Sequence, residues 1–162
     1  MGMHMRTTLA LVALLAGCAT VAGPGTPSTG VLAGGAARPG SEEDLVANVG
    51  DRVFFDFQRW DLQGREPLTQ KNFVTLDRQA AWLMQYAQND VQIAGNCDER
   101  GTEEYNLALG QRRADTTRAY LVAKSIAGER ISAISYGKER PTALGSAPDA
   151  WAQNRNAITS VR

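Results

Sequence analysis

Histidine is almost absent from this chain of 162 residues, because His4 is its only one. We expect His4 to be removed with an export signal, so that the mature chain would contain no histidine. That absence excludes Ser-His-Asp and Cys-His catalysis, in which imidazole is the base, and zinc sites with histidine ligands. Neither charge sign is in excess, with 17 Lys and Arg against 17 Asp and Glu. Sequence-independent binding to nucleic-acid phosphates therefore has little support.

The apolar run near the start, Leu9 to Ala16, is much shorter than the roughly 20 residues that a membrane-spanning helix needs. It follows Arg6 and leads into Leu15-Ala16-Gly17-Cys18, which has the form of a lipobox. We predict that residues 1–17 are a lipoprotein signal peptide and that Cys18 becomes the lipid-bearing first residue of the mature chain. The alternative is an ordinary signal peptide followed by a chance cysteine.

Cysteine is also scarce, with two residues in the chain. The pair would suit a disulfide in an oxidising compartment, but lipid on Cys18 would prevent pairing with Cys97. We then expect Cys97 to be a small buried residue and not a reactive thiol, since Arg100 is the only nearby cation that could lower its pKa. Ala19 stands where some bacteria use Asp to retain lipoproteins in the inner membrane, so by analogy we expect the outer membrane.

Glycine and proline are concentrated in residues 23–40, GPGTPSTGVLAGGAARPG. A segment of this composition cannot form a core. We therefore predict that residues 18–43 are a lipidated cysteine followed by a flexible tether, and that residues 44–162 are one globular domain.

Strand and helix patterns alternate through the predicted domain. The helix expected at 70–88 carries a stripe of apolar residues at helical spacing, with Thr69 as its N-cap, and Thr102 is the expected N-cap of the next helix. This order favours an α+β or α/β sandwich with a mixed four-stranded sheet, two main helices packed on it and an antiparallel last strand. The expected strands are 53–57, 91–94, 131–136 and 156–161, and the expected helices are 70–88, 103–124 and 149–153.

Four sequence segments resemble the OmpA-like peptidoglycan-binding domains, and among these the peptidoglycan-associated lipoproteins. They are GNCDERGTEEYNLALGQRRA at 95–114, VFFDFQRWDL at 53–62, SYGKERP at 135–141 and WAQNRNAI at 151–158. The resemblance implies a non-catalytic protein without cofactor or metal. It also implies an outer-membrane lipid anchor, a periplasmic domain that binds peptidoglycan, and a TolB-like periplasmic partner in the Tol-Pal system of envelope integrity and cell division.

Asp98 and Arg113 are the residues that the resemblance assigns to diaminopimelate in the peptidoglycan stem peptide. Their chemistry suits that ligand, which presents an ammonium and a carboxylate at one stereocentre, because arginine binds a carboxylate bidentately. Spacing alone does not predict the pair, since Arg113 lies about 16 Å along the helix from Thr102. Gly110, on the same helix face, is expected to leave room beside Arg113.

Weaker candidates for ligand contact are Phe57, Gln58, Asn96 and Thr102. Many relatives carry Asp in place of Gln58, and some carry His in place of Asn96, whose amide could instead form a loop-stabilising Asx turn. Arg155 is either structural or partner-facing.

The competing function is a murein hydrolase, because glycoside hydrolysis needs only paired carboxylates, one of them with a raised pKa. Asp98, Glu99, Glu103 and Glu104 are available for it. However, Arg100 and a helix N-terminus lie beside these acids and are expected to keep them ionised.

Overall fold

The computed structural model describes residues 37–162. The predicted signal peptide, the predicted lipid site at Cys18 and most of the predicted tether lie outside the described residues. The folded unit begins before residue 44, because the short helix α1 (Glu42–Asp44) is capped by the Ser41 hydroxyl and continues into a π-helical turn at Leu45–Val49. Asp44 accepts hydrogen bonds from the Gly40 amide and from Trp82 Nε1 of a later helix, at 2.9 and 2.8 Å.

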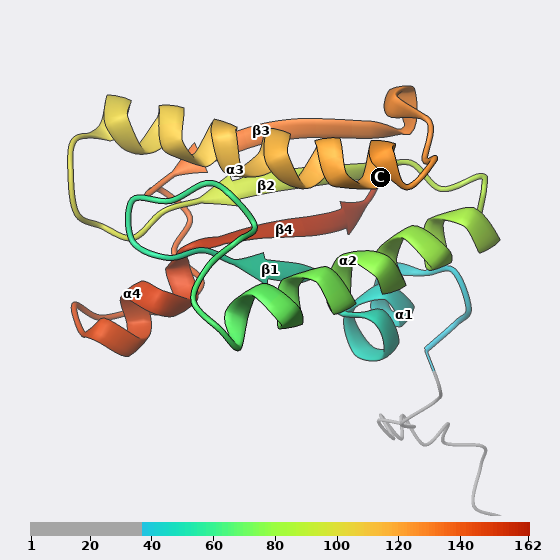
Figure 1. Cartoon of the computed structure of the whole chain (residues 1–162), viewed down its shortest axis with the longest axis horizontal. Coiled ribbons are helices and arrows are strands. Elements are labelled where there is room, and N and C mark those ends of the chain that lie inside the picture. Colours follow the sequence, from blue (N-terminus) through green and yellow to red (C-terminus); the bar gives the residue numbers. More distant parts are fainter. Residues whose placement is uncertain (1–36) are drawn as a thin grey trace, which may run out of the picture. The chain divides into compact units, whose positions relative to one another are not determined.

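The sheet has four strands in the order β1-β4-β2-β3 (Figure 1). Its strands are β1 (Arg52–Phe54), β2 (Val91–Asn96), β3 (Ile131–Gly137) and β4 (Asn156–Val161). β2 and β3 run parallel, whereas β4 runs antiparallel to both β1 and β2. The prediction of a mixed sheet with an antiparallel last strand is therefore confirmed. The last strand lies between β1 and β2, so that these two strands are not neighbours.

Two long helices, α2 (Leu68–Gln85) and α3 (Glu103–Ala123), lie along the sheet and contact each other (Figure 1). The apolar stripe predicted for α2 is confirmed at Leu76, Ala80 and Leu83, which are buried in the core. The short helix α4 (Pro148–Asn154) precedes β4 and confirms the helix expected at 149–153. None of the helices in residues 37–162 is long and apolar enough to cross a membrane.

The prediction that Thr69 caps α2 is wrong. The helix begins at Leu68 with Pro67 in the cap position, and the Thr69 hydroxyl donates to the carbonyl oxygen of Gly64 at 2.7 Å. Thr69 therefore ties the helix to the preceding loop. The second expected cap is confirmed, because Thr102 precedes α3 and its hydroxyl accepts from the Tyr105 amide at 3.2 Å.

Helix α3 approaches strand β2 at two facing glycines. A Cβ atom on Gly95 would overlap the carbonyl oxygen of Gly110, and one on Gly110 would overlap Ser135 Oγ. The expectation that Gly110 leaves room beside Arg113 is wrong, because its missing side chain instead lets the helix backbone reach the strand. This approach buries the face of α3 that carries Asn106, Arg113 and Thr117.

We predict that Gly95→Ala destabilises the domain, since the added methyl group would force α3 away from β2. Overpacking of this kind costs about 1–3 kcal/mol, which urea unfolding followed by circular dichroism would measure. Gly128→Ala is the comparison variant, because the three atoms nearest to its Cβ belong to the Arg118 and Val122 side chains, with Arg118 Nη2 nearest at 3.0 Å, and none of them is a backbone atom. Equal stabilities of the two variants would contradict this account of the contact.

Candidate functional site

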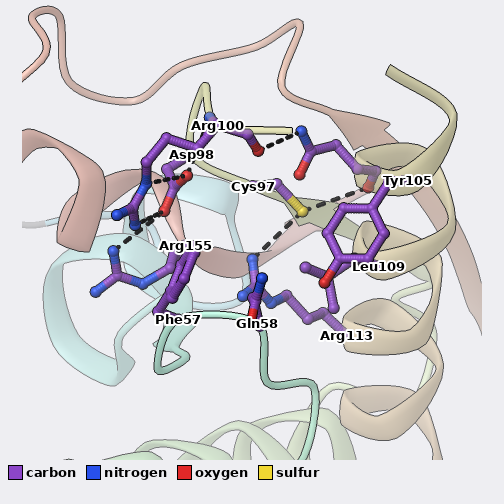
Figure 2. Close-up of a pocket in the computed structure, with 10 residues that line it drawn as sticks. Phe57, Gln58, Cys97, Asp98, Arg100, Tyr105, Leu109, Arg113 and Arg155 are labelled. Atoms are coloured by element: carbon purple, nitrogen blue, oxygen red, sulfur yellow. Dashed lines mark hydrogen bonds and ion pairs between the residues drawn. The ribbon is translucent and has the colours of Figure 1, made fainter. Parts of the chain in front are cut away.

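A small pocket lies where the loop after β1, the loop after β2 and the first half of α3 meet (Figure 2). The loop after β2 places Asp98 on one side of it, and α3 places Arg113 on the other, with Cys97 between them in Figure 2. Asp98 and Arg113 are 15 residues apart in the sequence, and the fold brings both to this pocket. Its lining residues are Phe57, Gln58, Cys97, Asp98, Arg100, Tyr105, Asn106, Leu109, Arg113 and Arg155.

Arg113 is fully buried, with 0% of its surface exposed. Its guanidinium donates to three backbone carbonyl oxygens, those of Arg59 (2.8 Å), Asn96 (2.7 Å) and Asp56 (3.2 Å), and weakly to Cys97 Sγ (3.4 Å). A guanidinium has five N–H donors, so one N–H on Nη2 has no protein acceptor within the described residues. None of the ion pairs there includes Arg113. Burial lowers the pKa of Arg113, and the charge lacks a carboxylate partner.

Asp98 is 4% exposed and is held by two arginines. Arg100 forms a bidentate contact with it, with Nε–Oδ1 at 3.0 Å and Nη2–Oδ2 at 2.7 Å. Arg155 Nη1 lies 3.3 Å from Oδ2. Burial alone would raise the pKa of Asp98, but the hydrogen bonds from Arg100 and Arg155 outweigh it and keep that pKa below its ordinary value. Asp98 is therefore an anion at neutral pH.

Arg100 lies between two aromatic rings. Its guanidinium carbon is 4.0 Å from the ring centroid of Phe57 and 4.2 Å from that of Trp151 on α4. Trp151 Nε1 also donates to Glu99 Oε1 at 2.9 Å. These contacts join the loop after β1, the loop after β2 and α4 around the Asp98 carboxylate.

The weaker candidates divide into two pairs. Phe57 and Gln58 line the pocket, and Gln58 adopts a left-handed backbone conformation with φ 58°. Asn96 does not line it, because its side-chain Nδ2 donates to Ala94 O and Asn156 Oδ1, and only its backbone oxygen reaches Arg113. Asn96 is the last residue of strand β2. Its side chain therefore does not form the loop-stabilising Asx turn considered from the sequence. Thr102 is an exposed helix cap outside the pocket.

Sequence reasoning missed several residues of the pocket. Tyr105, Asn106 and Leu109 belong to it because they are on the same side of α3 as Arg113. The helical spacing of Asn106 and Arg113 was visible in the sequence. The role of Arg155 was not, because its contact with Asp98 joins segments 57 residues apart.

Cys97 is a free, buried thiol, as expected. Its Sγ–H donates to the backbone oxygen of Asn106 at 3.3 Å, and burial raises the pKa of the thiol despite the nearby Arg113. It therefore lacks the thiolate character of a reactive cysteine. Within residues 37–162, no group of three or more His, Cys, Asp or Glu side chains is placed to hold a metal ion.

Three of the four acids that a hydrolase could use, Asp98, Glu99 and Glu104, have a lowered pKa in this structure. The pKa of Glu99 is lowered by hydrogen bonds from Ser146 and Trp151. That of Glu104 is lowered by hydrogen bonds with its own backbone amide and with Thr102. With the pKa of Asp98 lowered as well, these three acids are poor general acids, because that role needs a raised pKa.

We predict a pH dependence of stability from Asp98. A carboxyl group whose folded pKa lies below its ordinary 3.8 stabilises the fold above that value and loses the contribution as pH falls through the folded pKa. The free energy of unfolding in urea should therefore be lower for Asp98→Asn than for wild type at about pH 7, and this difference should be smaller at about pH 3. Asp115→Asn, on the exposed face of α3, is the control and should change stability little at either pH. A difference for Asp98→Asn that is the same at both pH values would contradict the prediction.

The sequence matches one family model and is similar to known proteins of the same family. The sequence model described as the OmpA family matches residues 55–155. The peptidoglycan-associated lipoprotein of Rhizobium meliloti is 46% identical over 152 residues, which cover 93% of this chain and 83% of the relative. That of Mesorhizobium japonicum is 46% identical over 156 residues, covering 94% and 89%.

Solved structures agree with this result. The crystal structure of the peptidoglycan-associated lipoprotein from Burkholderia pseudomallei is similar with a TM-score of 0.63 and 38% identity, covering 69% of this chain and 90% of that one. The C-terminal domain of Helicobacter pylori MotB, with a TM-score of 0.57 and 17% identity over 69% of this chain and 84% of that one, shares the fold.

Proposed function

This chain belongs to the OmpA family and, within it, to the peptidoglycan-associated lipoproteins, and we propose that it is a non-catalytic outer-membrane lipoprotein that binds peptidoglycan noncovalently. We further propose that the bound group is the diaminopimelate of the stem peptide. The observation that carries this proposal is the fully buried Arg113 guanidinium, which has no carboxylate partner in the described structure.

The pocket is complementary to the diaminopimelate head group in charge. Arg113 has one unused N–H for the ligand carboxylate, which allows a single charge-assisted hydrogen bond and not the bidentate contact expected from the sequence. Asp98, kept ionised by its surroundings, provides the anion for the ligand ammonium. Phe57, Tyr105 and Leu109 form an apolar part of the lining, which suits the methylene chain of the ligand.

We predict that Asp98→Asn and Arg113→Lys each remove most binding of purified sacculi. Asp98→Asn leaves the ligand ammonium without its anion, a loss on the order of 2–5 kcal/mol in a desolvated site. Arg113→Lys keeps the positive charge, but the three N–H donors of lysine cannot both hold the three carbonyl oxygens and bind the ligand carboxylate. Pull-down with sacculi measures the effect, and circular dichroism checks that each variant is folded.

Arg112→Lys is the matched control, because Arg112 is exposed, lies 4.9 Å from the Trp60 ring and does not line the pocket. It should bind as the wild type does. Peptidoglycan with lysine in place of diaminopimelate lacks the carboxylate that Arg113 would bind. The wild type should therefore bind it weakly, as weakly as Arg113→Lys binds peptidoglycan that contains diaminopimelate. Equal binding of both peptidoglycans by wild type would contradict the assignment.

The competing murein hydrolase function lacks an acid with a raised pKa among Asp98, Glu99 and Glu104. The two functions differ in outcome: incubation of sacculi with a hydrolase releases soluble muropeptides, and incubation with a binding protein does not.

We also propose a place for this protein in the envelope. The family suggests that lipid on Cys18 holds it in the outer membrane, with the domain in the periplasm. There it would act in the Tol-Pal system of envelope integrity and cell division and bind a TolB-like protein through a surface that overlaps the peptidoglycan site. Phe57 and Tyr105, which are 48% and 45% exposed at the pocket, are suitable residues for such a shared surface.

We predict that Cys18→Ala leaves the domain folded and releases the protein from membranes, because the substitution removes the sulfur that would carry the proposed lipid anchor. Detergent partitioning and membrane sedimentation measure the release. Peptidoglycan must be removed first, since the domain would otherwise sediment with it. Quantitative sedimentation of the variant with membranes free of peptidoglycan would contradict the lipid-anchor proposal.

A further inference from the structure

Asp98 has no acceptor position left for a ligand. A carboxylate offers about four acceptor positions, and both oxygens of Asp98 accept two donors each. Oδ1 accepts from the backbone amide of Arg100 at 3.2 Å and from its Nε at 3.0 Å. Oδ2 accepts from Arg100 Nη2 at 2.7 Å and from Arg155 Nη1 at 3.3 Å. An ammonium group can therefore bind this carboxylate only after one of these donors leaves.

The Arg100 side chain is the donor that is free to leave. Arg155 is 15% exposed and is also fixed by its Nε, which donates to the Phe55 carbonyl at 2.9 Å. The Arg100 backbone is fixed as well, because its carbonyl oxygen accepts from Asn106 Nδ2 at 2.9 Å. The Arg100 side chain, in contrast, is 35% exposed and within the described residues hydrogen-bonds only to Asp98. Its other contacts are with the Phe57 and Trp151 ring faces, so it can turn into solvent while the loop stays in place.

The position of the Arg100 guanidinium is a good binding site for another cation. It is formed by the Asp98 carboxylate and the ring faces of Phe57 and Trp151, with centroids at 4.0 and 4.2 Å. A carboxylate with aromatic faces around it is the environment that binds ammonium groups. Figure 2 shows the Arg100 side chain extending beside Asp98 toward Phe57 and Arg155.

We propose that Arg100 is an internal competitor of the ligand: its guanidinium fills the cation site formed by Asp98, Phe57 and Trp151 in the free protein and leaves it when the ligand ammonium binds. This inference rests on the proposed binding of diaminopimelate through Asp98. It assigns Arg100 the role of a specificity-determining residue. When the Arg100 ion pair with Asp98 is broken, only a ligand with a positively charged group can form a new ion pair with Asp98.

The competition has a measurable consequence for affinity. When the competent state is a minor fraction of the free protein, the apparent affinity falls by that fraction. Arg100→Gln removes the competitor, so it should bind meso-diaminopimelate about tenfold more tightly than wild type in isothermal calorimetry of the purified full chain. Pimelate, which has the same two carboxylates without ammonium groups, should bind Arg100→Gln no more tightly than wild type.

Arg112→Gln is the matched control, because it makes the same charge change at an arginine outside the pocket. Its affinity for meso-diaminopimelate should equal that of wild type. The proposal is overturned if Arg100→Gln binds meso-diaminopimelate no more tightly than wild type does. It is also overturned if the substitution increases the affinity for pimelate as much as that for meso-diaminopimelate. If Asp98→Asn and Arg113→Lys bind as wild type does, the proposed function itself fails.

A measurement on the wild type keeps the proposal testable if Arg100→Gln does not fold. The Arg100 Nε–H resonance, assigned through its backbone, reports the hydrogen bond to Asp98 in nitrogen-15 NMR. Saturation with meso-diaminopimelate should move this resonance to the position of a solvent-exposed arginine, and saturation with pimelate should not. A resonance that is unchanged at saturation with meso-diaminopimelate overturns the proposal.

Discussion

The burial of the Arg113 guanidinium is the constraint on which the site depends. A buried charge is costly unless hydrogen bonds satisfy it, and here the carbonyl oxygens of Asp56, Arg59 and Asn96 do so. They belong to the loop after β1 and to the end of β2, so a single side chain of α3 fixes this loop against the end of the strand. Only arginine has enough donors in a planar fork to hold three carbonyls and keep one N–H for a ligand.

The charge of the pocket differs from that of the chain. The whole chain is neutral, yet three arginines and one aspartate line the pocket. Arg100 and Arg155 both contact Asp98, and Arg113 does not. Arg100, Arg155 and Asp98 together carry one positive charge in excess, and Arg113 carries a second one without a carboxylate partner, in a desolvated position where electrostatic interactions are strong. With the proposed ligand, an anionic group would therefore gain most of its binding free energy at Arg113.

Periodicity predicted much of the fold. The limits of β4 and the buried stripe of α2 both follow from local patterns, because side-chain alternation and helical spacing are properties of neighbouring residues. The strand order did not follow, since the pairing of β1 with β4 joins segments about 100 residues apart. The facing glycines at Gly95 and Gly110 show the same limit: each is visible alone, but their contact exists only in the folded chain.

The site was also predicted only in part, because many of its contacts join segments that are far apart in the sequence. The resemblance indicated Asp98 and Arg113, and both line the pocket, although their contacts with a ligand stay predictions. The surroundings of Asp98 could not be predicted, because its partner Arg155 and the Phe57 and Trp151 rings that contact Arg100 come from segments far apart in the sequence. Thr102 was predicted in two roles and has the local one, as a helix cap.

The arrangement of the pocket implies that recognition depends mainly on the ligand carboxylate. The proposed exchange of Arg100 for a ligand ammonium would replace one ion pair of Asp98 with another, so the net gain at Asp98 would be smaller than that of an ion pair formed anew. A carboxylate at Arg113 replaces no protein anion, because none contacts that guanidinium in the described residues. With the proposed ligand, the Arg113 contact would then add more to the free energy of binding than the ammonium contact, and the ammonium contact would determine which carboxylates are accepted.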